Sequence, residues 1–159
     1  MVAAIVVYSN TGNTRRVAEA VGKSLAVPVA SLLAPMVKPT PWAVLRLGFA
    51  TLCGGTTPVQ LQGANPAGAE LVVLAAPVWA GRLSVPMRSW LATHPALPER
   101  VALVMTGGAP TVSPNAFADF ASHAGRKPVA TFYASEAEVK AGTFTAACEA
   151  FCRKLAMPG

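Results

Sequence analysis

The sequence is poor in acidic residues, in cysteine and in uninterrupted apolar runs. Seven Asp and Glu stand against thirteen Lys and Arg, a formal net charge of +6, yet charged residues make up only 13% of the chain and apolar residues 53%. This balance excludes an intrinsically disordered chain, which combines low hydrophobicity with high charge. The longest apolar run, Leu71–Ala80, is interrupted by Pro77 and is shorter than the roughly 18 to 20 residues that cross a membrane.

Two further absences concern the compartment and the partners. The first residues lack the basic segment of a secretory signal, and Cys53, Cys148 and Cys152 are too few for a disulfide framework. Basic residues are scattered and no aromatic residues interleave with them, so no nucleic-acid partner is expected. We therefore expect one reduced, cytoplasmic, globular domain over residues 1–159, without an integral membrane segment.

Short apolar runs alternate with helical patterns along the chain. Strands are predicted at Ala3–Tyr8, Val27–Ser31, Glu70–Ala76, Val101–Thr106 and Val129–Ala134. Helices are predicted at Thr14–Ala26, Pro41–Leu52, Ser84–Thr93, Ser113–Ala124 and Thr143–Leu155, with a polar connection from the second helix to about Ala69. This alternation indicates βαβ units, hence a three-layer α/β fold with a five-stranded parallel sheet. The order 2-1-3-4-5 is among the few topologies that right-handed crossovers allow.

The helix at Pro41–Leu52 has two interpretations. In the ordinary one, Trp42, Leu45 and Phe49 pack against the sheet. In the other, these residues and Arg46 form a basic amphipathic helix that lies on a membrane surface.

The loop after the first strand is rich in hydroxyl and amide groups and leads directly into a helix. It comprises Ser9, Asn10, Thr11, Gly12, Asn13 and Thr14. Unpaired N–H groups at a helix N-terminus, with hydroxyl donors around them, can hold a phosphate without a lysine. The loop is neither a Walker A loop nor a GxGxxG loop, so a dinucleotide is not expected. An ordinary capped helix is the alternative interpretation.

This segment resembles the signature of the flavodoxin family. The resemblance rests on Val6–Thr14 (VVYSNTGNT) followed by Ala18 and Val21, with Val7 where the signature usually has Phe or Tyr. In that family the loop binds the phosphate of FMN. The resemblance covers nearly the whole chain and implies a flavodoxin-like fold with one FMN bound non-covalently through Ser9–Thr14.

Two more loops are expected at the same edge of the sheet. One contains Trp79, whose indole offers a plane for stacking, and the other contains the pair Gly107-Gly108, which permits close backbone approach. By themselves, Trp79 fits a core residue and the glycine pair a plain turn. The flavodoxin resemblance implies that the flavin ring is contacted by Pro77, Val78, Trp79, Ala80, Gly81, Thr106, Gly107 and Gly108. The third loop has no aromatic residue, so one ring face is expected to be open.

The resemblance implies an FMN-binding redox protein, with electron transfer as the first hypothesis. The alternatives are an FMN-dependent NAD(P)H oxidoreductase acting on quinone-type acceptors, and a binding module of this fold that has lost flavin. The positive net charge favours an acidic redox partner or an anionic small-molecule electron donor or acceptor. No catalytic side chain and no metal site is expected: His94 and His123 lack metal-ligand spacing, and Asp119 lies within a helix. Arg82 is the cation expected nearest the ring edge.

Overall fold

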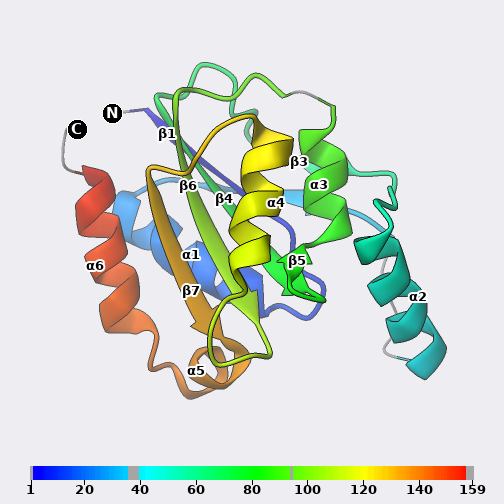
Figure 1. The fold of residues 1–159 in the computed structure, drawn as a ribbon. Coiled ribbons are helices and arrows are strands. Elements are labelled where there is room, and N and C mark those ends of the chain that lie inside the picture. The colour runs from blue at the N-terminus through cyan, green and yellow to red at the C-terminus, as the bar shows by residue number, and fades with distance from the viewer. Residues whose placement is uncertain (1, 36–39, 94, 157–159) are drawn as a thin grey trace.

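The computed structural model describes residues 2–35, 40–93 and 95–156 and consists of a sheet between two layers of helices (Figure 1). The strands are β1 (Ala3–Val7), β2 (Val29–Leu33), β3 (Gln60–Gln62), β4 (Leu71–Trp79), β5 (Arg82–Leu83), β6 (Arg100–Gly107) and β7 (Ala130–Ser135). The helices of the described residues are α1 (Asn13–Leu25), α2 (Pro41–Leu52), α3 (Val85–Leu91), α4 (Pro114–Ala124), α5 (Glu136–Ala141) and α6 (Thr145–Ala156). Within these residues, no helix has the length and apolar character needed to span a bilayer.

Five strands pair in parallel in the order β2-β1-β4-β6-β7, which is the order predicted for the five strands expected from the sequence. The prediction of a purely parallel five-stranded sheet is nevertheless wrong. β3, which lies within the connection predicted to be polar, pairs antiparallel with β2. β5 pairs antiparallel with β4. Strands of three and two residues are too short to show a hydrophobic period, and β3 carries two glutamines.

Two boundaries also differ from the prediction. β4 continues past Ala76 through Pro77 to Trp79, where a loop was expected. Pro77 has no N–H to donate, but its carbonyl accepts a hydrogen bond from the Ser84 amide at 3.1 Å, so the strand continues through it. Helix α5 was missed because it occupies six residues directly after β7.

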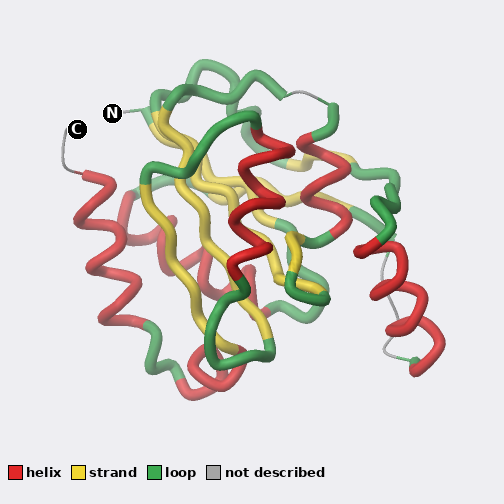
Figure 2. Tube along the Cα trace, viewed as in Figure 1, coloured by secondary structure: helices red, strands yellow, loops and turns green. Residues whose placement is uncertain are grey.

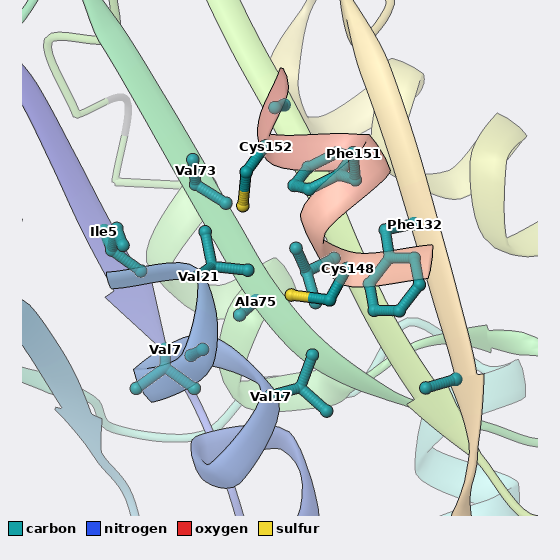
Figure 3. Packing of buried hydrophobic residues seen from close by; sticks show 14 of the residues in the cluster. Ile5, Val7, Val17, Val21, Val73, Ala75, Phe132, Cys148, Phe151 and Cys152 are labelled. Atoms are coloured by element: carbon teal, nitrogen blue, oxygen red, sulfur yellow. The ribbon is translucent and has the colours of Figure 1, made fainter. Parts of the chain in front are cut away.

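The two faces of the sheet carry separate cores. On one face, Ile5, Val7 and Val73 pack against α1, α5 and α6, where Cys148 and Cys152 are buried (Figure 3). On the other face, alternate residues such as Val6 and Leu74 pack against α3 and α4. Because helices cover both faces, the central strands are apolar at consecutive positions, which explains their strong sequence signal.

Helix α2 differs from the other helices in how it is placed. It begins after Thr40, whose hydroxyl accepts from the Ala43 amide at 3.2 Å, and it lies against β4 and β5 at the right-hand side of the view in Figure 2. The expectation that Trp42, Leu45 and Phe49 pack against the sheet is wrong, because these side chains are exposed. The helix is apolar on nearly every side, so its pattern alone does not show which side faces the protein.

Helix α1 approaches β2 and the turn before it closely at Gly22. A Cβ atom at this position would lie 2.8 Å from the Val27 carbonyl oxygen and 3.0 Å from Cγ2 of Val29. The Val27 amide donates to the Gly22 carbonyl at 2.9 Å, so the backbone of this turn has little freedom to move away. Glycine therefore allows the close contact between α1 and β2.

We expect Gly22→Ala to lower the free energy of unfolding by about 1 to 3 kcal/mol, although alanine is the better helix former. Gly48→Ala in α2 is the matched control, because a Cβ there meets no described atom within 4 Å. It should raise the free energy of unfolding by up to about 1 kcal/mol. Urea unfolding of both variants tests this, and effects of the same sign would contradict the packing argument.

Candidate functional site

The carboxyl ends of β1, β4 and β6 meet at one edge of the sheet. The register aligns Val7 with Ala75 and Pro77 with Thr106, and the Tyr8 amide donates to the Ala75 carbonyl at 2.9 Å. The loop after β1, the turn between β4 and β5, and the loop after β6 therefore lie side by side. All three segments that were singled out in the sequence are brought together here.

The loop after β1 ends in an open helix start. Gly12 is the N-cap of α1 with φ 93° and ψ −15°, a left-handed conformation, and within the described residues no side chain caps the helix. The Ser9 hydroxyl instead accepts from the Gly12 amide at 3.1 Å, and the Arg16 amide donates to the Gly12 carbonyl at 3.0 Å. The first-turn amides of α1 thus point outward as donors with partial positive charge.

A cavity of about 70 Å³, here called the small cavity, lies at this helix start. Its lining residues are Asn10, Thr11, Asn13, Thr14, Pro77, Val78, Trp79, Thr106, Gly107 and Glu136. The predicted phosphate loop and the ends of β4 and β6 therefore line the same cavity. Glu136, from α5, was not predicted.

Two buried hydroxyl groups face each other in the small cavity. Oγ1 of Thr14 and Oγ1 of Thr106 are 2.8 Å apart, and each residue is 2% exposed. The two hydroxyls carry two protons and use one in their shared hydrogen bond. One O–H donor therefore remains available inside the cavity.

Trp79 lies in a tight hairpin rather than in a free loop. Trp79 pairs with Arg82, and the two turn residues Ala80 and Gly81 have φ values of 49° and 74°. Positive φ at both positions is the pattern of a type I′ turn, which is costly for alanine. The half-buried indole meets the ring of Tyr8 edge-on, with centroids 5.7 Å apart and an interplanar angle of 87°.

A second cavity of about 420 Å³, here called the large cavity, adjoins the first. It is lined by Val78, Ala80, Gly81, Gly107, Gly108, Ala109, Thr111, Val112, Ser113, Pro114 and Tyr133, so the two cavities share Val78 and Gly107. Every predicted site residue except Ser9 and Gly12 lines one of these two cavities of the described chain. Ser9 and Gly12 shape the loop instead.

Tyr133 is a site residue that sequence reasoning missed. It comes from β7, and its hydroxyl donates to the Ala109 carbonyl at 2.6 Å, which fixes the loop after β6. Burial, with Glu138 and Glu136 nearby, raises the pKa of Tyr133, so the phenol stays protonated as this donor. A Cβ on Gly107 would lie 2.9 Å from the Tyr133 oxygen, so a larger residue there would force the Tyr133 hydroxyl to shift.

A capping box places Glu136 beside the small cavity. The amide and hydroxyl of Ser135 both donate to Oε2 of Glu138 at 2.7 Å, and these hydrogen bonds lower the pKa of Glu138. The box fixes the start of α5, whose first residue is Glu136. Lys140 lies 3.6 Å from Glu136 and offsets its charge.

Asp119, for which the sequence predicted no role, holds the β4–β5 hairpin against α4. It is 6% exposed and accepts from the Leu83 amide at 3.2 Å. Two arginines surround it: Arg82 at 3.4 Å and the buried Arg88 at 3.7 Å. Arg82 therefore points to Asp119 and, contrary to expectation, is not among the residues that line the two cavities. His123 contacts the Asp119 carbonyl at 2.8 Å, and His94 lies outside the described residues.

Asp119 partly offsets the cost of burying the charge of Arg88. Burial lowers the pKa of Arg88 and the carboxylate of Asp119 partly opposes that shift. Its Nε and Nη2 atoms have no hydrogen-bond partner among the described residues. The guanidinium is therefore buried with one counter-ion.

We expect Asp119→Asn to lower the free energy of unfolding by about 3 kcal/mol, because it leaves the Arg88 charge buried without a counter-ion. Adding Arg88→Met should recover much of that loss, since the buried charge is then removed as well. Denaturant unfolding of the single and double variants measures both values. Additive losses in the double variant would mean that the two side chains stabilise the fold independently.

A search of protein-family models finds no match, and a search of curated proteins finds none either. Similar solved structures do exist. A flavoprotein from Lactobacillus acidophilus, in complex with FMN, matches with a TM-score of 0.71 and 18% identity over 89% of this chain and 97% of that one. An NAD(P)H:quinone oxidoreductase from Methanothermobacter marburgensis matches with a TM-score of 0.57 and 10% identity over 99% and 98%.

A third match is the Trp repressor binding protein from Bacillus subtilis, with a TM-score of 0.56 and 10% identity over 95% of this chain and 98% of that one. At these identities the likeness concerns the fold alone. The chain has the three-layer flavodoxin-like fold that the resemblance of its β1–α1 segment implied. Two short antiparallel strands are added to that fold.

Proposed function

We propose that the protein binds FMN non-covalently and serves as a redox protein. The observation that carries the proposal is the convergence of an uncapped helix start, a hydroxyl pair and an indole on two connected cavities. A protein of the same fold has been solved in complex with FMN. When bound, FMN supplies hydride or single-electron transfer, while the protein supplies binding, orientation and electrostatics.

The phosphate end of the ligand fits the small cavity. The first-turn amides of α1, the hydroxyl of Thr11 and the spare proton of the Thr14–Thr106 pair are neutral donors on residues that line or adjoin this cavity. Lys and Arg are absent from the described residues that line this cavity, so these donors and the helix dipole would balance the phosphate charge. The pairing of Glu136 with Lys140 reduces the repulsion from the one carboxylate present.

The ring end fits the hairpin and the large cavity. The volume of about 420 Å³ lies within the roughly 300 to 1,000 Å³ of cofactor pockets. Trp79 offers a stacking plane, and the Ala80-Gly81 turn and Gly107-Gly108 offer backbone groups with little side chain in the way. Tyr133 supplies the aromatic group that the loop after β6 lacks.

Electron transfer to a partner is the first role that we propose. The second is an NAD(P)H oxidoreductase with a quinone-type acceptor, and the large cavity favours it. That cavity extends past the hairpin to Thr111, Ser113 and Pro114, which leaves room for a second small molecule beside the ring.

We expect Thr11→Ala to weaken FMN binding about 10- to 100-fold while riboflavin binding stays unchanged, because a hydrogen bond to a charged group contributes about 1.5 to 3 kcal/mol. Thr111→Ala, which lines only the large cavity, is the matched control and should not separate the two ligands. Titration calorimetry measures all four affinities. Equal losses of FMN and riboflavin affinity in Thr11→Ala would remove the phosphate assignment, and no binding of either ligand by the unmodified protein would favour a module without flavin.

The two roles separate in a turnover assay. An electron carrier reconstituted with FMN should consume NADPH, with a quinone present, no faster than free FMN does. An oxidoreductase should show saturable NADPH consumption, and Thr111→Trp should reduce it by narrowing the large cavity at the loop after β6, with FMN affinity measured on the same variant. The first result supports electron transfer, and the second assigns the oxidoreductase role.

A further inference from the structure

Helix α2 presents an apolar stripe to the outside of the molecule. Trp42, Leu45, Phe49 and Leu52 are 76%, 62%, 69% and 59% exposed. At 100° per residue they fall within an arc of about 80°, so they form one continuous strip, here called the α2 stripe. Other exposed large apolar residues lie outside α2, such as Leu33 on β2 and Val129 just before β7.

The composition of α2 requires an apolar environment on both sides. Arg46 is its one charged residue, and a helix that is apolar all round is normally buried all round. One side of α2 lies against β4 and β5. The stripe on the other side offers on the order of 500 Å² of apolar surface, which is large for a surface without a partner.

Acidic residues are absent from α2 and from the sequence on either side of it. Between Glu19 and Glu70 the sequence contains no Asp or Glu. In the layer formed by α2, α3 and α4 the one acidic residue is Asp119, which is buried and paired with arginines. The glutamates of the helices, Glu19, Glu136, Glu138 and Glu149, all lie on α1, α5 and α6, which cover the opposite face of the sheet.

Cations remain on the α2 side of the molecule. Arg46 lies about 40° from Trp42 around the helix, at the edge of the stripe. Arg82 comes from β5, against which α2 lies, and its side chain is 39% exposed. An apolar strip with Arg46 at its margin and no Asp or Glu in its own helix matches an anionic lipid surface.

We propose that the α2 stripe docks on an anionic lipid bilayer. A helix of 12 residues is about 18 Å long, too short for a hydrocarbon core of about 30 Å, so α2 lies along the surface. Trp42, Leu45, Phe49 and Leu52 then enter the boundary between headgroups and acyl chains, and Arg46 meets lipid phosphates. The attachment does not require FMN and goes beyond the proposed redox role.

A second copy of the chain fits the stripe less well. The area on the order of 500 Å² is below the roughly 800 Å² that each partner contributes to a standard interface. Two paired α2 helices would offer no carboxylate to either Arg46. Each chain also carries a formal charge of +6, which opposes self-association at low salt.

Co-sedimentation with lipid vesicles tests the proposal. The unmodified protein should bind vesicles of phosphatidylcholine and phosphatidylglycerol more tightly than vesicles of phosphatidylcholine alone, and added salt should weaken the binding.

Phe49→Ser should weaken binding about tenfold or more, and Arg46→Glu should remove most of the preference for anionic lipid. Val129→Ser is the matched control, because Val129 is 51% exposed and lies just before β7, outside α2. Vesicles should also shift the tryptophan emission to the blue, and Trp42→Phe should abolish that shift.

Two results would overturn the proposal. One is equal binding of the unmodified protein and Phe49→Ser, with circular dichroism showing that both are folded. The other is no binding to anionic vesicles at low salt. A dimer in sedimentation velocity that Phe49→Ser disrupts, without vesicle binding, would assign the stripe to a second copy instead.

Discussion

The Tyr8 amide donates to the Ala75 carbonyl at the last step of the β1–β4 ladder, and the arrangement of the candidate site depends on this parallel pairing. The pairing ends β1 beside the middle of β4, so the loop after β1 turns over β4 toward β6. The hydrogen bond between Thr14 and Thr106 then joins the first turn of α1 to the end of β6. A shift of one residue in this register would reverse the side chains of a strand between the two cores.

The layer of α3 and α4 supports the same edge from the other side. The β4–β5 hairpin that carries Trp79 has a two-residue turn, and its strands are paired at two positions. Asp119 compensates by accepting from the Leu83 amide and by lying between two arginines. The position of the indole therefore depends on a carboxylate in a helix, 36 residues beyond Leu83 in the chain.

Much of the fold could be predicted from the sequence, because both faces of the sheet are covered and its central strands are continuously apolar. The loop around Gly12 could be predicted as well, since its residue types belong to a local helix start. Predictions failed where the signal is not local. β5 is two residues long, Tyr133 reaches the loop after β6 from another strand, and the partners of Asp119 are distant in sequence. For α2, the apolar pattern predicted the helix but not which of its sides faces the protein.

The shared hydrogen bond between Thr14 and Thr106 has two possible directions, because either oxygen can be the donor. If Thr14 donates, the outward proton belongs to Thr106, and if Thr106 donates, it belongs to Thr14. The outward donor can thus appear at either of two oxygens 2.8 Å apart while every heavy atom stays in place. An anion entering the small cavity selects the direction by its own position. The polarity of this part of the cavity is therefore set by the ligand, through rotation of two O–H bonds alone.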